Sequence, residues 1–241
     1  PHAAHIVERL HASQTLMQVD ADVAELFGTC AGMPLFVIAT GPSLEMHFQR
    51  LRTIREQQPR PLFICVDTAY RPLLEQGIRP DIVVTIDQRI AERHLPPAGT
   101  SAIRLVYMPM VDPSVLSAWQ GPRYVAYSPS PIYQVLRQQF PRGELHGGGS
   151  VIHPAVDLAV KMGAGEITLF GADFAFPGNK THAGWNDGEL GPQFGAAKHW
   201  VLDGHGQRIK TQLNFRSYLC ELERFIARHP QVRFYNSSRA G

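Results

Sequence analysis

The sequence contains few cysteines and no large excess of charge of either sign. Its three cysteines, Cys30, Cys65 and Cys220, are odd in number and far apart among 241 residues. This spacing predicts neither a disulfide framework nor a zinc site, and it favours a reducing compartment. The formal net charge is only +2, from 23 basic and 21 acidic residues. Such a balance gives no electrostatic reason to expect nucleic acid or an anionic membrane surface as a partner.

Long hydrophobic runs are also missing. No apolar stretch approaches the roughly 18 residues that span a bilayer. The first residues, Pro-His-Ala-Ala, lack the basic and apolar regions of a signal peptide. We therefore expect a cytoplasmic protein without a membrane span. The chain begins with Pro rather than Met, which predicts a fragment or a processed product.

The familiar phosphate-binding motifs are absent too. No G-x-x-x-x-G-K-[ST] occurs, because Asn179 precedes Lys180 and Thr181, and no G-x-G-x-x-G follows the first apolar run. The one Asp-x-Asp, at 20–22, lies in a stretch with helical spacing rather than after a strand. These absences weaken P-loop and dinucleotide interpretations. They also predict that a phosphate-bearing ligand binds without a metal ion.

What is present is a regular alternation of apolar runs and helical patterns. Continuous apolar runs at 34–39, 62–66, 81–86 and 166–170 are typical of strands buried on both faces of a parallel sheet. Further predicted elements are strands at 103–107, 124–127 and 232–235, a hairpin at 199–202 and 207–211, and helices at 44–57, 151–162 and 215–227. The alternation predicts a Rossmann-like α/β fold, with a doubly wound, mostly parallel sheet and a small C-terminal hairpin and helix extension.

The same pattern predicts the domain organisation. Apolar positions at helical spacing in 6–17 and 21–27 indicate a helical N-terminal segment over residues 1–32. Residues 33–241 then form one nucleotide-binding domain, whose size is within the range of single α/β domains. Residues 179–193 are rich in Gly, Asn, Asp and His. They predict a surface loop over the edge of the sheet that could act as a lid.

Polar residues follow the predicted strands directly, where ligands bind in open α/β sheets. The candidate binding residues after strands are Gly41, Pro42, Ser43, Asp67, Thr68, Asp87, Gln88 and Asp173. A glycine-rich loop before a helix adds Gly148, Gly149 and Ser150, and the polar loop adds Lys180 and Thr181. Such a loop presents backbone N–H groups and a hydroxyl at the positive end of a helix, as a phosphate or carboxylate requires. Each turn alone is equally compatible with an ordinary turn or cap, with Ser43 and Ser150 as N-caps. The hypothesis of a site therefore depends on convergence of these turns.

One histidine is placed to act as an acid or base. His182 follows Lys180 and Thr181 in the polar loop, and an imidazole with a pKa of about 6.5 exchanges protons near neutrality. His153, in the helix after the glycine-rich loop, is the second candidate, although an inward-facing structural role explains it equally well. The chain has 11 histidines, most of which we expect on the solvated surface.

Four strings of the sequence resemble a known family in order and spacing. They are Val-Ile-Ala-Thr-Gly-Pro-Ser-Leu (37–44), Val-Asp-Thr-Ala (66–69), Gly-Ile-Arg-Pro-Asp-Ile-Val-Val-Thr-Ile-Asp (77–87), and Gly-Ala-Asp-Phe-Ala-Phe (171–176) followed by Lys-Thr-His-Ala (180–183). Together they resemble the central domain of the bacterial motility accessory factors, over roughly residues 33–241. The flanking domains of the long members are missing from this sequence, so its acceptor can differ from theirs.

The resemblance implies a glycosyltransferase. Motility accessory factors are implicated in flagellin glycosylation, in which a nonulosonic acid moves from its CMP-activated form to Ser or Thr. Their central domain is similar to metal-independent bacterial CMP-sialic acid sialyltransferases that use a histidine base. The resemblance thus implies a CMP-sugar donor, no cofactor, and flagellin or a surface glycan as the acceptor.

The same resemblance assigns roles by motif. Gly41, Pro42 and Ser43 would contact the phosphate or sugar of the donor, and Asp67 and Asp87 would bind the nucleotide or shape its pocket. The stretch Gly148 to Ser150 would face the carboxylate or phosphate. The base that takes the proton of the acceptor hydroxyl would be His182.

Two alternatives stay open at this point. The same broad family includes an archaeal 6-hydroxymethyl-dihydropterin pyrophosphokinase, a reaction that needs ATP, Mg²⁺ and a pterin. A non-catalytic module that binds nucleotide sugars within a glycosylation complex is the third interpretation. AMP release that depends on magnesium and pterin selects the kinase, and donor binding without transfer selects the module.

Overall fold

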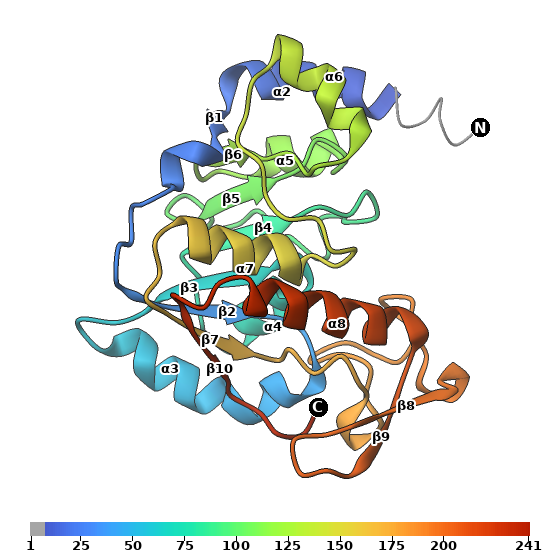
Figure 1. Ribbon diagram of the computed structural model, residues 1–241. Helices are drawn as coiled ribbons and strands as arrows, with labels where there is room; N and C mark the ends of the chain where they lie inside the picture. Colours follow the sequence, from blue (N-terminus) through green and yellow to red (C-terminus); the bar gives the residue numbers. More distant parts are fainter. Residues whose placement is uncertain (1–7) are drawn as a thin grey trace.

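The computed structural model describes residues 8–241, and its main feature is a fully parallel sheet (Figure 1). The strand order is β1-β6-β5-β4-β3-β2-β7-β10. The strands are β1 (Ala21–Asp22), β2 (Pro34–Ile38), β3 (Leu62–Val66), β4 (Ile82–Thr85), β5 (Arg104–Tyr107), β6 (Arg123–Val125), β7 (Glu166–Phe170) and β10 (Arg233–Asn236). The chain proceeds from β2 through β6 in one direction and then returns to β7 on the other side of β2. The order thus reverses between β2 and β7, which is where ligands bind in doubly wound folds.

Helices connect the strands and cover the sheet. The α-helices are α2 (Gln14–Val19), α3 (Phe48–Glu56), α4 (Asp67–Glu75), α5 (Pro113–Ala118), α6 (Pro131–Gln139), α7 (Ile152–Lys161) and α8 (Leu213–Ala227), and the 3₁₀ helices are η1 (Val23–Leu26), η2 (Pro42–His47), η3 (Pro177–Asn179) and η4 (Phe194–Ala196). A separate antiparallel hairpin pairs β8 (His199–Leu202) with β9 (Arg208–Thr211). Figure 1 shows α7 and α8 together over one face of the sheet. No helix among residues 8–241 has the length and apolar character needed to cross a membrane.

The central strands confirm the predicted fold class. All four residues of β4 and four of the five in β3 are buried. The reason is that helices cover both faces of a parallel sheet, so both sets of alternating side chains enter the core. Each fully buried aliphatic side chain in such a core stabilises the fold by about 1.5–3 kcal/mol. This explains why the sequence shows continuous apolar runs here instead of alternation.

Two predicted helix caps are wrong. Ser43 lies inside η2 rather than before a helix, and its hydroxyl donates to the carboxylate of Asp173. Helix α7 begins at Ile152 with Val151 as its N-cap, so Ser150 lies one residue too early to cap it. Both serines stand in the expected turns, but tertiary contacts set the local geometry.

The N-terminal segment also differs in detail from the prediction. Residues 6 and 7 of the expected first helix lie outside the described residues, while residues 8–12 and α2 are helical. The helix expected at 21–27 is instead the edge strand β1 followed by η1, since Asp22 and Glu25 form a capping box that starts the 3₁₀ turn. Strand β1 pairs with β6, and Met17 and Leu26 belong to the same hydrophobic core as the sheet.

Helices α5 and α6 were not predicted. Each begins with proline, at Pro113 and Pro131. Proline suits the first position of a helix because its missing N–H is not needed there. In sequence, however, a further proline precedes each helix, at Pro109 and Pro129, and such stretches are also typical of loops.

A partly buried ion-pair cluster connects α3 and β3 to the residue before β4. Asp81 binds the guanidinium groups of Arg55 and Arg60 at 2.8 and 2.9 Å and accepts the Phe63 N–H at 2.8 Å. Burial alone would raise the pKa of Asp81, but these bonds outweigh it and lower that pKa below its usual value. We expect Asp81→Asn to reduce the free energy of unfolding by roughly 2–3 kcal/mol at pH 7, because two arginines lose their partner.

The destabilisation caused by Asp81→Asn should decrease as the pH falls. A carboxyl whose folded pKa is depressed stabilises the protein above its unfolded pKa of about 3.9, and this stabilisation disappears as the pH falls through the folded pKa. The free energies of unfolding of the wild type and Asp81→Asn, measured in urea, should therefore differ by the full amount at pH 7 and become equal below pH 4. Glu56→Gln, an exposed carboxylate beside Arg55, is the control. An equal difference at pH 3 and pH 7 would contradict the ion-pair explanation.

Candidate functional site

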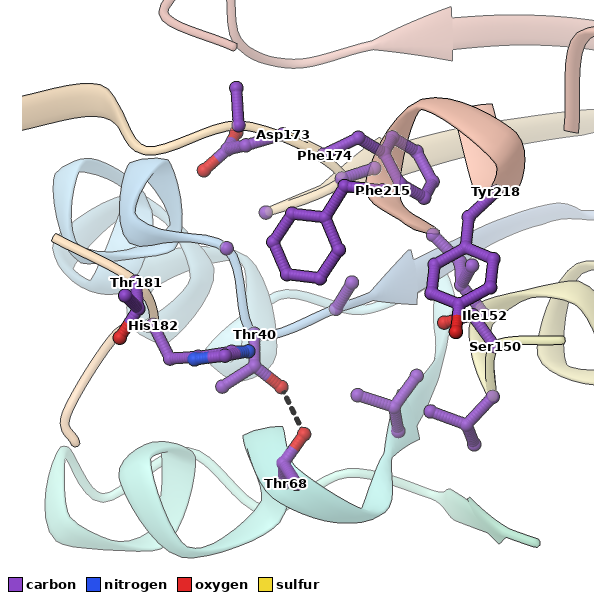
Figure 2. Close-up of a pocket in the computed structure, with 17 residues that line it drawn as sticks. Thr40, Thr68, Ser150, Ile152, Asp173, Phe174, Thr181, His182, Phe215 and Tyr218 are labelled. Atoms are coloured by element: carbon purple, nitrogen blue, oxygen red, sulfur yellow. Dashed lines mark hydrogen bonds between the residues drawn. The ribbon is translucent and has the colours of Figure 1, made fainter. Parts of the chain in front are cut away.

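Two contiguous cavities open at the carboxyl edge of the sheet. The first, of about 100 Å³, lies at the β2–β7 reversal. The second, of about 570 Å³, continues toward the ends of β3 and β4 and is within the size range of small-molecule sites. Residues that line both are Thr68, Ser150, Val151, His182, Phe215 and Tyr218. Figure 2 shows the first cavity, with His182 and Thr68 on one side and Phe215 and Tyr218 from α8 on the other.

The turn after β2 is fixed by the end of β7. The Gly41 N–H donates to the Gly171 carbonyl at 2.8 Å. A Cβ at Gly41 would stand 2.4 Å from that oxygen and 2.5 Å from Asp173 Oδ2, so this position accepts only glycine. Gly41 lines the first cavity, whereas Pro42 and Ser43 are buried outside the lining.

Asp173 occupies the start of η2, where a ligand anion was expected. Its Oδ2 accepts the Ser43 N–H at 2.7 Å and its Oδ1 accepts the Ser43 hydroxyl. Burial raises the pKa of Asp173, although both bonds from Ser43 oppose this rise. Since a protein carboxylate already meets these donors, they are not available to an external phosphate.

The glycine-rich loop is shaped by packing against a histidine and a tyrosine. A Cβ at Gly148 would stand 2.4 Å from Cγ of His153, and Gly149, at φ +88°, lies against the ring of Tyr218. The Ser150 N–H donates to His153 Nδ1 at 3.2 Å, and His153 Nε2 lies 3.0 Å from the Tyr218 carbonyl. Nδ1 also lies 3.0 Å from the Ser150 carbonyl. His153 thus links the loop to α8 through both ring nitrogens, and burial lowers its pKa.

The first turn of α7 forms the polar floor of the site. Ser150, Val151 and Ile152 all line the first cavity. The first N–H groups of any α-helix have no partner within the helix, and they carry the positive end of its dipole. Such N–H groups and the hydroxyl of Ser150 are the donors that the prediction of an anion site at this loop requires.

His182 lies opposite this turn and is uncharged. Burial lowers the pKa of His182 to about 4, and its Nδ1 has no hydrogen-bond partner among the described residues. Its ring meets Phe215 edge-on at 6.3 Å between centroids. Beside it, the hydroxyls of Thr40 and Thr68 are 2.5 Å apart (Figure 2). The imidazole can therefore accept a proton, but no carboxylate in the described residues orients it.

Two carboxylates at neighbouring strand ends have opposite pKa shifts. Asp67 is 1% exposed, and burial raises its pKa to about 7, with a further rise from the charge of Asp87. Its Oδ1 accepts the Thr68 N–H at 2.7 Å, while its Oδ2 has no hydrogen-bond partner among residues 8–241. For Asp87, burial is outweighed by hydrogen bonds from Arg89, which lower its pKa. Groups with separated pKa values in one cavity are typical of functional sites.

The comparisons with known proteins agree with this architecture. A family model described as 6-hydroxymethylpterin diphosphokinase MptE-like matches residues 9–179. The chain belongs to this MptE-like family. A 6-hydroxymethyl-7,8-dihydropterin pyrophosphokinase from Methanothermobacter thermautotrophicus is 33% identical over 161 residues, which are 65% of this chain and 64% of that enzyme's length.

A solved structure extends the comparison beyond the family model. The MAf glycosyltransferase from Magnetospirillum magneticum AMB-1 superposes with a TM-score of 0.73 at 20% identity, covering 98% of this chain and 37% of the other. The resemblance predicted from the motifs is thereby confirmed, as is the fold. This MptE-like chain spans less than two thirds of the length of both proteins.

The MptE-like chain brings most of the predicted site residues to the two cavities. Those in the lining are Gly41, Asp67, Thr68, Asp87, Gly149, Ser150, Asp173, Thr181 and His182. Those outside it are Pro42, Ser43, Gln88, Gly148 and Lys180. Lys180 turns away and pairs with Glu45 at 2.7 Å. As a result, Arg89 is the only arginine or lysine among the described lining residues, and it already binds Asp87.

Several lining residues were missed in the sequence. They are Thr40, Arg89, Gln212, Asn214, Phe215 and Tyr218. Thr40 directly precedes the quoted glycine turn, so its position at a strand end was a usable signal. The α8 residues carry no such signal, because only the return of the chain after β9 places them over the strand ends.

The contact between Gly148 and His153 gives a second prediction for the MptE-like protein. We expect Gly148→Ala to lower the free energy of unfolding by about 1–3 kcal/mol, since the added methyl meets a ring that is bonded at both nitrogens. In a His153→Ala background, the same substitution should be nearly neutral, which a double-mutant cycle in urea would measure. Gly147→Ala, whose Cβ would stand 3.2 Å from Cβ of Ser128, is the matched control. Equal losses with and without His153 would refute the packing explanation.

Proposed function

We propose that this protein binds a CMP-activated nonulosonic, sialic-acid-like sugar and transfers it to a hydroxyl of a protein or glycan. The observation that carries the proposal is a cavity in which the first turn of α7 lies opposite a half-buried neutral imidazole, His182, with α8 forming a further wall. His182, Phe215 and Tyr218 lie after residue 179, where the pterin family model ends. The glycosyltransferase match covers 98% of the chain, which favours sugar transfer over the kinase reaction.

The residues suit a transfer that needs no metal. In the proposed reaction, the acceptor oxygen bonds to the anomeric carbon as the bond from that carbon to the phosphate oxygen breaks, and CMP leaves. Charge builds on the leaving phosphate, where the N–H groups of Val151 and Ile152 and the Ser150 hydroxyl stabilise it. The proton of the acceptor hydroxyl passes to the imidazole of His182. The sugar passes through an oxocarbenium-like state, as in related glycosyl chemistry.

The partners and location follow from the same proposal. The donor is a nucleotide sugar, the acceptor is flagellin or a surface glycan, and the reaction takes place in the cytoplasm. Nucleic acid is not a partner, consistent with the net charge of +2. Residues 33–241 form the nucleotide-binding domain in this proposal.

Calorimetry with cytidine nucleotides tests the proposal. We expect CMP to bind in buffer containing EDTA, with an affinity that does not change when Mg²⁺ is added. Ser150→Ala should weaken this binding several-fold, since one hydroxyl donor is lost. A wild-type protein that binds no cytidine nucleotide in either buffer would overturn the proposal.

A pterin pyrophosphokinase is the second candidate, and two observations favour it. One is the 33% identity to the archaeal enzyme. The other is that Asp67 and Asp87 line the same cavity. This arrangement favours the kinase because Mg²⁺ is bound by one or two carboxylates together with substrate phosphates. In that case these two residues would hold the ion, which would neutralise charge on the transferred diphosphate. AMP release that requires ATP, Mg²⁺ and 6-hydroxymethylpterin together would select this function and displace sugar transfer.

A further inference from the structure

The beginning of α8 forms one wall of both cavities, and no motif assigns it a role. Phe215 and Tyr218 line both spaces, and Gln212 and Asn214 line the larger one. The two rings are 6.3 Å apart between centroids at an interplanar angle of 41°. Figure 2 shows both rings between the α8 backbone and the strand ends, opposite Thr68 and His182.

The rings of Phe215 and Tyr218 pack against neighbouring residues and also line the cavities. Phe215 packs on the buried ring of Phe176 at 5.4 Å. Tyr218 lies against Gly149, and its carbonyl is bonded to His153. Both side chains are only half-buried. Rigid aromatic rings beside open polar space offer their π-faces to a planar ligand.

The chemistry around the rings specifies what kind of planar ligand fits. The amides of Gln212 and Asn214 each carry donors and an acceptor, which suits the edge of a nitrogen heterocycle. Ser150 and the first turn of α7 lie in the same cavities as the rings. A single ligand could therefore place a heterocycle at α8 and a phosphate at α7. A nucleotide has both groups.

We propose that Phe215 and Tyr218 form a stacking platform for the planar heterocycle of the substrate, with the amides of Gln212 and Asn214 at its polar edge. The identity of the ring depends on the proposed function, in which it is the cytosine of the donor. The beginning of α8 then determines which nucleotide binds, whereas α7 holds its phosphate.

The test compares a ligand that has a base with one that lacks it. Phe215→Leu and Tyr218→Leu keep apolar volume but remove the π-face. We expect each to raise the Kd for CMP about 5- to 100-fold, the range for loss of one base–aromatic stack. The Kd for ribose 5-phosphate, which has no base, should change less than about two-fold. Tyr235→Leu, an exposed aromatic on β10, is the matched control and should leave both values unchanged.

The other possible results of this experiment also decide for or against the stacking platform. An unchanged CMP affinity in both leucine variants overturns the platform and leaves the proposed function intact. Equal weakening of CMP and ribose 5-phosphate also overturns it, because general damage to the cavity would then explain the loss. If the wild type binds 6-hydroxymethylpterin and no cytidine nucleotide, the proposed function fails. In that case, weaker pterin binding by the leucine variants still supports the platform, and unchanged pterin binding overturns it.

Discussion

Replacing His182 by alanine is expected to lower kcat for sugar transfer about 10²- to 10⁴-fold, the usual contribution of a positioned general base. His182 is the one histidine in the described lining of the cavities. Because burial lowers its pKa to about 4, the imidazole is almost entirely neutral at pH 7. KM for the donor should change much less than kcat, since the proposal assigns the phosphate to α7 and not to His182. His205→Ala, in the exposed hairpin turn, is the control.

The pH profile distinguishes a base from a residue that only fills space. A bound phosphate places negative charge near the imidazole and favours its protonated form, so the pKa rises when the donor binds. The acidic limb of kcat/KM, which reports the free protein, should lie near pH 4, and the acidic limb of kcat should lie at a higher pH. His182→Gln keeps hydrogen bonding but cannot take the proton. Full activity of the glutamine variant would remove His182 from the role of base.

The sheet was predictable because its sequence signal is local. Burial on both faces makes β2, β3, β4 and β7 continuous apolar runs, and parallel strands bring their polar ends to one edge. Short edge elements were less visible. For instance, β1 has only two residues, and its pairing with β6 depends on a contact about 100 positions away along the chain.

The site was predictable only in outline, because tertiary contacts decide which groups remain free. The motif that contains Ser43 was identified, but nothing nearby in sequence shows that Asp173 takes both of its donors. Lys180 precedes the site residues directly, yet Glu45 draws it away from the cavity. Conversely, Phe215 belongs to an ordinary amphipathic helix and gains its position from the path of the chain after β9. Spacing can locate turns, whereas the orientation of side chains in them depends on distant partners.

Replacing Asp67 by asparagine is expected to stabilise the protein by up to about 4 kcal/mol at pH 8 to 9, the largest effect on stability that we predict. In the folded protein its pKa is about 7 rather than 3.8, because burial penalises the ionised form. A carboxyl with a raised folded pKa contributes its full stability below the unfolded pKa, and loses this contribution as the pH rises through the folded pKa. Ionised Asp67 therefore destabilises the fold by about 1.4 kcal/mol for each pH unit between the two values.

Urea unfolding at several pH values measures this effect. The side-chain amide that Asp67→Asn introduces can still accept the Thr68 N–H, so this variant should match the wild type near pH 4 and exceed it increasingly from pH 5 to 8. Asp187→Asn, an exposed residue whose side chain also accepts a backbone N–H, should show no such trend. A constant difference across this range would show that Asp67 does not titrate in the folded protein. If the variant is more stable at pH 8 but transfers sugar or diphosphate poorly, the buried charge is retained for function at the expense of stability, as expected for an active-site carboxylate.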